Sequence, residues 1–121
     1  MKDSALINKS KNFALEVLKV CKELRATKCE GVLINQFLRS GTSIGANVRE
    51  AFYAHSKADF VSKLQIALKE CYETEYWIEL LRDSEYLSTT ESSSILEDIR
   101  EIIRLLISIV KSTKASLNRQ Q

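Results

Sequence analysis

Hydrophobic residues recur along most of this chain at the three- and four-residue spacing of an amphipathic α-helix, not at the alternate positions of a β-strand. This period predicts four helices, at residues 4–27, 31–54, 57–84 and 90–117. Ser56 followed by Asp59 has the spacing of a capping box, which marks the start of a helix. Ser88 and Glu91 repeat this pattern before the last predicted helix. Residues 118–121 are expected to form a frayed tail.

The composition is typical of a helical bundle. The 121 residues contain no Pro and only three Gly, which argues against a loop-rich β-sandwich. Hydrophobic residues make up 45% of the chain, which excludes a disordered or collagen-like protein. A chain of this length suits one domain with its own core. We therefore predict an all-α fold with a single four-helix bundle domain over residues 1–121.

The second predicted helix carries two glycines inside its apolar stripe, Gly41 and Gly45. Each costs about 1 kcal/mol relative to Ala in a helix interior, so close approach of a neighbouring helix backbone is the expected compensation. The opposite face of this helix is entirely polar and holds Gln36, Arg39, Ser43, Asn47 and Glu50. This polar face either faces solvent or contacts another subunit or a ligand.

The third predicted helix places a carboxylate, Glu75, in the middle of its core-facing arc. A carboxylate in that position needs a partner, or must lie near a helix end or an interface. Ile66, Trp77 and Leu80 form a second apolar patch on the back of the helix, among charged residues.

The last predicted helix has an unusually wide apolar face. Its apolar residues, from Leu105 round to Ile107, span about 200° of arc, whereas the edge helix of a monomeric bundle needs about 100° or somewhat more. This surplus predicts burial against other subunits and therefore a homo-oligomer.

Charge is unevenly distributed, although the net charge is only +2. Residues 1–29 carry seven Lys and Arg against three acidic residues, whereas residues 55–85 carry four against seven. This asymmetry fits a basic first helix that lies near an acidic third helix of the same or a neighbouring subunit.

Cations on the first two helices are the feature that would contact nucleic acid. The candidate nucleic-acid-binding residues are Lys11, Lys19, Lys22, Arg39 and Arg49. No aromatic residue interleaves with the lysines, so binding would depend on phosphate charge and on salt, with little sequence preference. The alternative is that these lysines serve solubility, beside Glu16 and Glu23.

Residues suited to enzymatic chemistry are sparse. Cys21, Cys29 and Cys71 lack C-x-x-C spacing and His55 is the single histidine, so we expect reduced thiols and no zinc site. No Ser/His/Asp, Cys/His or phosphate-loop arrangement is present. We therefore expect no catalytic residue, no metal and no cofactor, and we predict that the protein is not an enzyme.

Two acidic pairs superficially resemble the paired acidic motifs of all-helical nucleotide pyrophosphatases. They are Glu70-x-x-Glu73 and Asp98-x-x-Glu101. Asp98 and Glu101 are predicted to point to the solvated side of the last helix, so we interpret the similarity as coincidental.

Apolar runs in the chain are short. The start lacks the continuous apolar core of a secretory signal, and the longest run near the end falls far short of the about 20 residues of a membrane span. We expect a cytoplasmic protein with no membrane association.

Two runs in the middle of the chain carry a resemblance to a known family. They are QFLRSGTSIGANVREA at residues 36–51 and ALKECYETEYWIELL at residues 67–81, connected through residues 56–60. They resemble the four helix bundle protein family, also called the 23S rRNA intervening-sequence protein or S23 family. The specific match covers about residues 32–87, and the turn at residues 26–31 departs from members with a longer, Pro-containing connection.

The resemblance implies an antiparallel up-down four-helix bundle that assembles into a homopentameric, barrel-like ring. No catalytic activity is associated with the family. Some members are encoded within intervening sequences of bacterial 23S rRNA genes, and related accessory proteins of diversity-generating retroelements bind nucleic acid and a reverse transcriptase. The matched positions imply a set of assembly or motif residues: Gly41, Ser43, Gly45, Asn47, Glu50, Glu70, Glu73, Glu75 and Trp77.

Two functions are compatible with these features. The first is a non-enzymatic oligomer that associates with RNA or DNA through backbone electrostatics. The alternative is a protein–protein interaction scaffold or accessory subunit, for example of a reverse transcriptase, with no direct nucleic-acid binding. In that case Trp77, Tyr76 and the polar face of the second helix would dock a partner or a sister subunit.

Overall fold

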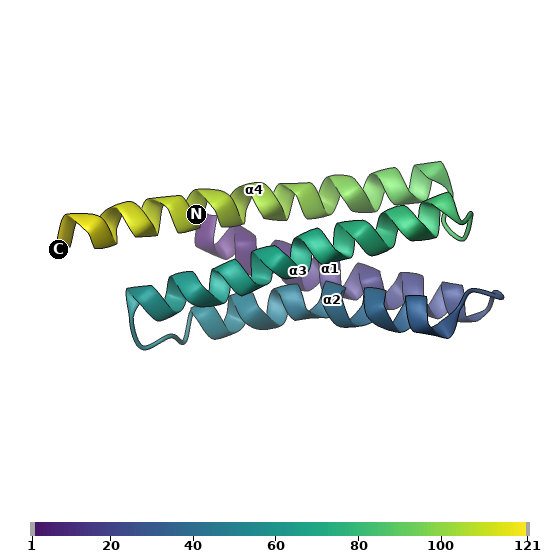
Figure 1. Ribbon diagram of the computed structural model, residues 1–121, viewed down its shortest axis with the longest axis horizontal. Helices are drawn as coiled ribbons and strands as arrows, with labels where there is room; N and C mark the ends of the chain where they lie inside the picture. The colour runs from purple at the N-terminus through teal and green to yellow at the C-terminus, as the bar shows by residue number, and fades with distance from the viewer. Residues whose placement is uncertain (1, 121) are drawn as a thin grey trace.

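The computed structural model describes residues 2–120, apart from the side chain of Gln120, and within this range the fold is all-α. Four helices follow one another along the chain: α1 (Lys2–Arg25), α2 (Gly31–Ala51), α3 (Lys57–Asp83) and α4 (Thr89–Gln120). Figure 1 shows them lying along a common long axis, with the chain turning back at each of the three short connections. No strand occurs between residues 2 and 120.

Each helix of the bundle packs against two of the others. α2 packs against α1 and α3, and α4 packs against α3 and α1, whereas the α1 and α3 backbones lie diagonally opposite, with no Cα pair within 8 Å in residues 2–120. Figure 1 shows the same arrangement, with α4 above, α2 below, α3 in front and α1 behind. The basic first helix therefore does not lie against the acidic third helix of its own chain.

Local hydrogen bonds begin α3 and α4 where the capping signals predict. Asp59 donates its backbone N–H to the Ser56 hydroxyl at 3.0 Å. Before α4, Glu91 donates its N–H to the Ser88 hydroxyl at 3.0 Å, and Ser88 donates its own N–H to the Glu91 carboxylate at 3.3 Å. The sequence identifies these two starts because a capping box involves only neighbouring residues.

Three helix ends differ from the predicted ones by two or three residues, and α3 ends one residue early, at Asp83. α1 ends at Arg25, where the Thr27 hydroxyl donates to the Leu24 carbonyl at 2.6 Å and closes the turn. α2 ends at Ala51, and Tyr53 and the next residue continue in tighter turns that bond three residues back. The predicted frayed tail is helical in residues 118–120, and residue 121 lies outside the described residues.

The buried face of α1 is rotated relative to the predicted stripe. The helical period of the sequence predicts an apolar stripe made of Leu6, Ile7, Phe13, Ala14, Val17, Leu18, Cys21 and Leu24. Val20, outside this stripe, is buried, whereas Leu18, within it, is 48% exposed. The physical reason is that α1 packs against α2 and α4 but not against α3, so its core face points between those two neighbours.

The wide apolar face of α4 is covered within one chain. Its buried residues are Ile95, Leu96, Ile99, Ile102, Ile103, Leu106, Ile109 and Val110. Leu105 also packs against the core, and Ile107, at 44% exposed, is the large apolar side chain of α4 that is solvent-accessible among the described residues. The prediction that a single chain leaves much of this apolar face uncovered is therefore wrong, because α3 and α1 pack against α4 from two sides and together cover a broad arc. This helix face does not itself require another subunit.

Candidate nucleic-acid interface

Three of the five candidate cations project from α1. Lys11, Lys19 and Lys22 are exposed, and none has an ion-pair partner within the described part of the chain. Lys11 and Lys22 are eleven residues apart, so helix geometry places them on the same side of α1, about 16 Å apart along its axis. Lys19 is rotated by about 80° from Lys11 around the same axis.

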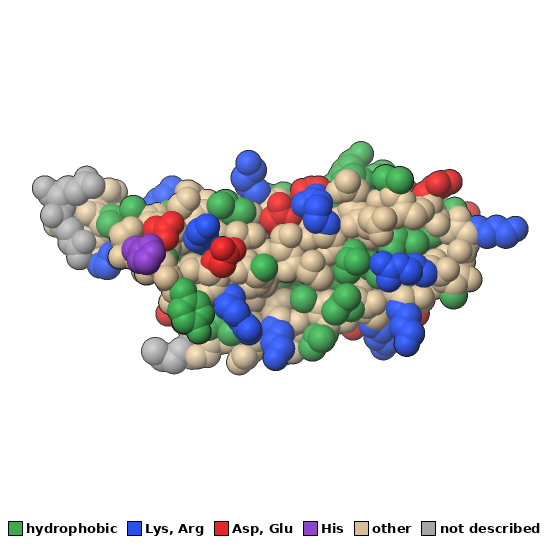
Figure 2. Space-filling view, turned by 90° about the horizontal axis from the view of Figure 1, so that it is seen from below, with side chains coloured by type: hydrophobic (Ala, Val, Ile, Leu, Met, Phe, Trp, Pro, Cys, Tyr) green, Lys and Arg blue, Asp and Glu red, His purple; other side chains and the backbone are tan. Residues whose placement is uncertain are grey.

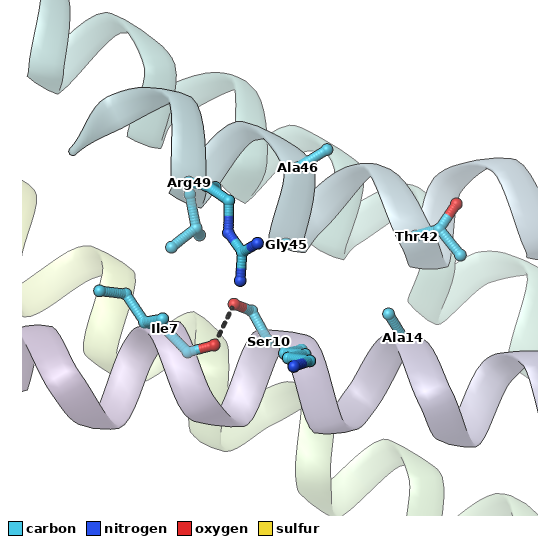
Figure 3. A pocket seen from close by; sticks show the side chains of 9 residues that line it. Ile7, Ser10, Ala14, Thr42, Gly45, Ala46 and Arg49 are labelled. Carbon is cyan, nitrogen blue, oxygen red and sulfur yellow. Dashed lines mark hydrogen bonds between the residues drawn. The ribbon is translucent and has the colours of Figure 1, made fainter. Parts of the chain in front are cut away.

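Arg49 joins this set from the neighbouring helix. It lies near the end of α2, and together with Lys11 it lines a hollow between α1 and α2. Figure 3 shows the Arg49 side chain extending from α2 toward Ser10 on α1. Arg49 is exposed and, like Lys11, forms no ion pair with any residue that the structure describes. The structure thus brings Lys11 and Arg49 together from two helices.

The two glycines of α2 explain how closely these helices approach. A Cβ atom on Gly45 would lie 3.3 Å from the backbone oxygen of Ser10, and one on Gly41 would lie 2.8 Å from Cγ2 of Val17. The close approach predicted from the sequence is confirmed, with α1 as the partner. Within the single chain, both glycines serve the packing of α1 on α2.

Arg39 is engaged elsewhere. Its guanidinium donates to the Glu70 carboxylate at 3.2 Å and also pairs with Glu73 on α3, while its Nε donates to the Gln36 amide oxygen at 3.1 Å. Trp77 donates its indole N–H to Glu73 at 3.2 Å. Several motif residues therefore form one network on the α2–α3 side, and Arg39 is not a free cation like Lys11 or Arg49.

The carboxylate predicted to need a partner has one. Arg100 on α4 donates its Nε to Glu75 at 3.2 Å, and the Glu75 side chain is 21% exposed. The sequence indicates the need for a cation but not its identity, because Arg100 is 25 residues away along the chain.

The polar face of α2 is held largely by local bonds. Ser43 donates its hydroxyl to the Arg39 carbonyl at 2.6 Å, and Asn47 donates its amide to the Ser43 carbonyl at 2.9 Å. Glu50 lies 3.9 Å from the Lys63 ammonium on α3. This face is therefore partly covered by α3, and its role in assembly stays a prediction.

Two buried hydroxyl groups were not predicted from the sequence. Ser40 and Thr74 are both fully buried, and their hydroxyl oxygens lie 2.9 Å apart where α2 meets α3. The position of Ser40 between the core residues Phe37 and Ile44 is the sequence signal that could have identified it. The pair satisfies two polar groups inside an apolar interface.

An aromatic side chain also lies beside the cations. Tyr53 is 81% exposed and shares two hollows with Arg49, which precedes it by four residues. The expectation that no aromatic residue interleaves with the lysines did not consider this ring, which lies beside Arg49 and not beside a lysine of α1. The i, i+4 spacing near the end of α2 is the signal that could have revealed the pair.

The acidic pairs do not converge on one site. Glu70 and Glu73 pair with Arg39 on the α2–α3 side. Asp98 and Glu101 line a hollow on the α1–α4 side, where Glu101 pairs with Lys9 at 3.0 Å. Partial desolvation, followed by the nearby carboxylates of Glu101 and residue 97, raises the pKa of Asp98 above its ordinary value.

Metal and thiol chemistry have little support in the described residues. Residues 2–120 hold no group of three or more His, Cys, Asp or Glu side chains placed to bind a metal ion. The three cysteines are free, and burial raises the pKa of the Cys21 and Cys71 thiols. Both thiols behave as small core side chains rather than as nucleophiles.

Basic side chains are spread over the face that α2 presents. Figure 2 views the molecule from below Figure 1, with α2 nearest the viewer, and shows Lys and Arg side chains across this face with hydrophobic side chains between them. Most acidic side chains visible there lie in the upper half of the picture.

None of the described helices combines the length and apolar character needed to cross a membrane.

A family profile and several solved structures match the chain. The family profile described as 23S rRNA-intervening sequence protein matches residues 2–108, which include all of α1 as well as the two runs identified in the sequence. A crystal structure of a protein with unknown function from the S23 ribosomal protein family of Bacteroides thetaiotaomicron is 52% identical, with a TM-score of 0.89, and the match covers 92% of this chain and 99% of that chain. No curated protein matches the chain.

Proposed function

The chain belongs to the 23S rRNA-intervening sequence protein family, and from this premise we propose that it is a non-enzymatic, homo-oligomeric bundle that binds the phosphate backbone of RNA or DNA. The observation that supports this function is the set of unpaired cations on the α1–α2 side. Lys11 and Arg49 line one hollow that contains no acidic residue, and Lys22 continues the line along α1.

Such a surface suits phosphate more than bases. Lysine and arginine that neutralise phosphates release counterions, which gives sequence-independent binding that weakens with salt. Tyr53 beside Arg49 adds one exposed ring on which an unpaired base can stack, so single strands are favoured over duplexes. The antiparallel bundle and the pentameric ring implied by the family would repeat this modest surface five times.

Fluorescence anisotropy with short labelled RNA and DNA in low salt tests this function. We expect binding that weakens steeply with salt, and a triple Lys11→Gln, Lys22→Gln, Arg49→Gln variant whose salt slope is smaller by about 2 for each subunit engaged. Absence of binding by the wild type at micromolar concentration would refute the proposal.

A matched variant controls for total charge. Lys69→Gln, Lys111→Gln and Lys114→Gln remove the same three charges from exposed positions on α3 and α4. We expect this variant to keep most of the wild-type affinity. Equal losses in the two triple variants would show that only net charge matters and would contradict the assignment to the α1–α2 side.

A protein-interaction surface is the second candidate, and α3 favours it. Ile66, Tyr72 and Tyr76 are exposed apolar side chains on this helix, and Tyr76 packs edge-on against Trp77 with ring centroids 5.1 Å apart. Three exposed large side chains on one helix are suited to contact a sister subunit or another protein. Because α1 and α3 carry opposite excess charge and lie diagonally opposite within a chain, α1 of one copy and α3 of the next are complementary.

Light scattering measures this association directly. We expect an oligomer for the wild type and a smaller species for Tyr76→Glu, which places a charge in the exposed patch. Tyr53→Glu, at an exposed tyrosine just after the end of α2, is the control and is expected to leave the mass unchanged. A monomeric wild type would refute both the oligomer and the α3 interface. The cytoplasm is the proposed location, in keeping with three free thiols.

A further inference from the structure

The hollow between α1 and α2 has an apolar wall and a cationic rim. Ile7 and Ala14 of α1 and Ala46 of α2 contribute apolar surface, and Lys11 and Arg49 contribute the charges. In Figure 3 the Arg49 guanidinium reaches into the space between the two helices, above Ser10. Because Gly45 lacks a side chain, the helices approach closely beneath the hollow and give it a floor.

The neutral hydroxyls of the hollow are already used as donors. Ser10, which is buried, donates to the Ile7 carbonyl at 3.2 Å, and Thr42 donates to the Leu38 carbonyl at 2.8 Å. The donors left for a ligand are therefore the two cationic groups, Lys11 Nζ and the Arg49 guanidinium. A ligand that satisfies both must present an anionic acceptor.

The absence of a carboxylate distinguishes this hollow from two others on the surface. The hollow on the α1–α4 side is lined by Lys9 together with Glu16, Asp98 and Glu101. The one beyond Arg49 near the end of α2 also contains acidic side chains. Between α1 and α2 no carboxylate neutralises the cations, so an anion from solution meets uncompensated positive charge there.

The size of the hollow limits the ligand. Its volume is about 220 Å³, and an apolar protein cavity of about 150 Å³ accommodates benzene. A single ring or a short aliphatic chain with one carboxylate fits this space, whereas a nucleotide is too large to enter completely.

We propose that this hollow binds a small organic carboxylate with an apolar body the size of one ring or a short chain. The carboxylate pairs with Arg49 and Lys11, and the apolar body contacts Ile7, Ala14 and Ala46. This binding does not require the nucleic-acid function, although the same two cations would serve both.

Titration of the isotope-labelled protein with benzoate, followed by amide NMR, tests the site. The Gly45 amide reports directly on the floor, and a chain with three glycines makes it easy to assign. We expect a saturable shift with a Kd on the order of 1 mM, since a ligand this small makes few contacts. Benzyl alcohol, which has a similar shape but is neutral, should bind at least about tenfold more weakly than benzoate.

Filling the hollow separates this site from the phosphate surface. Ala46→Leu adds apolar volume without changing charge, so it should abolish benzoate binding and leave nucleic-acid binding intact. Ala115→Leu, an exposed position on α4, is the matched control and should bind benzoate like the wild type.

Four results would overturn the proposal: no saturable shift at Gly45, equal binding of benzyl alcohol, unchanged binding by Ala46→Leu, or dissociation of an oligomer by benzoate. The last would identify the hollow as a contact between copies. Loss of nucleic-acid binding alone would affect only the function proposed above.

Discussion

Two arginines on one helix have different environments. Arg39 and Arg49 both project from α2, but Arg39 lies against α3, where it pairs with Glu70 and Glu73. Arg49 lies on the opposite side, against α1, where the nearest cation in the shared hollow is Lys11 and no carboxylate lines the space. On the α2–α3 side carboxylates neutralise the arginine. On the α1–α2 side no carboxylate in the shared hollow neutralises Lys11 or Arg49.

The difference shows that the neighbouring helix decides what a charged residue does. α3 supplies carboxylates and turns Arg39 into a structural link between helices. α1 supplies lysines and leaves Arg49 available to an external anion. The residue type and the helix are the same in both cases, and the two arginines differ in the neighbouring helix that each one faces.

A side chain inserted between α1 and α2 at Gly45 should have the largest effect on stability. We expect Gly45→Val to lower the free energy of unfolding by about 2 kcal/mol, because even a Cβ would lie 3.3 Å from the Ser10 carbonyl and the helices would have to separate. Urea denaturation followed by circular dichroism measures the change.

Gly31→Ala is the control for this substitution. Nothing lies within 4 Å of the position that its Cβ would occupy, so stability should change by less than about 0.5 kcal/mol. A Gly45→Val protein as stable as the wild type would show that the helices do not depend on this close approach.

Neutralising each arginine tests the comparison itself. Arg39→Gln should destabilise the fold by about 1 kcal/mol, because it leaves Glu70 and Glu73 close together without their cation. Arg49→Gln should change stability by less than about 0.5 kcal/mol, since it breaks no ion pair between described residues. Thermal denaturation of the two variants side by side is the measurement, and equal losses would contradict the distinction drawn between the two sides of α2.

The smallest effect is expected at the α1–α4 side, where carboxylates crowd together. Folding raises the pKa of Asp98, so its protonated form favours the folded state and its ionised form opposes it. The stabilisation of the fold by this group is fully present below its ordinary pKa of 3.8, and it is lost as the pH rises through the raised pKa of the folded state. Asp98→Asn should therefore be slightly more stable than the wild type at pH 7, by less than about 0.5 kcal/mol. The gain should vanish near pH 3.5. A variant less stable than the wild type at pH 7 would show that the ionised carboxylate is favourable there.

Features that depend on nearby residues could be predicted from the sequence. The four helices follow from hydrophobic period, and the starts of α3 and α4 follow from Ser56 and Ser88 with their partners three residues on. The glycines of α2 predicted a close neighbour, because only contact offsets their cost in a helix.

Features that depend on the arrangement of the helices in space could not be predicted from the sequence. The exposed Leu18 and buried Val20 reflect the absence of α3 beside α1, and the covered face of α4 reflects the presence of both α1 and α3. The candidate site changed for the same reason, since Arg39 is paired and no longer a free cation, and the Tyr53 ring lies beside Arg49.

The sequence by itself determined the all-α class, the starts of α3 and α4 and the family, because each rests on periodicity, local hydrogen bonds or a continuous motif. The tertiary structure alone decided the partner of Glu75, the pairing of Arg39 and the open charge of Lys11 and Arg49. Electrostatic pairing depends on distances between atoms that are far apart along the chain, and those distances are set only when the helices pack.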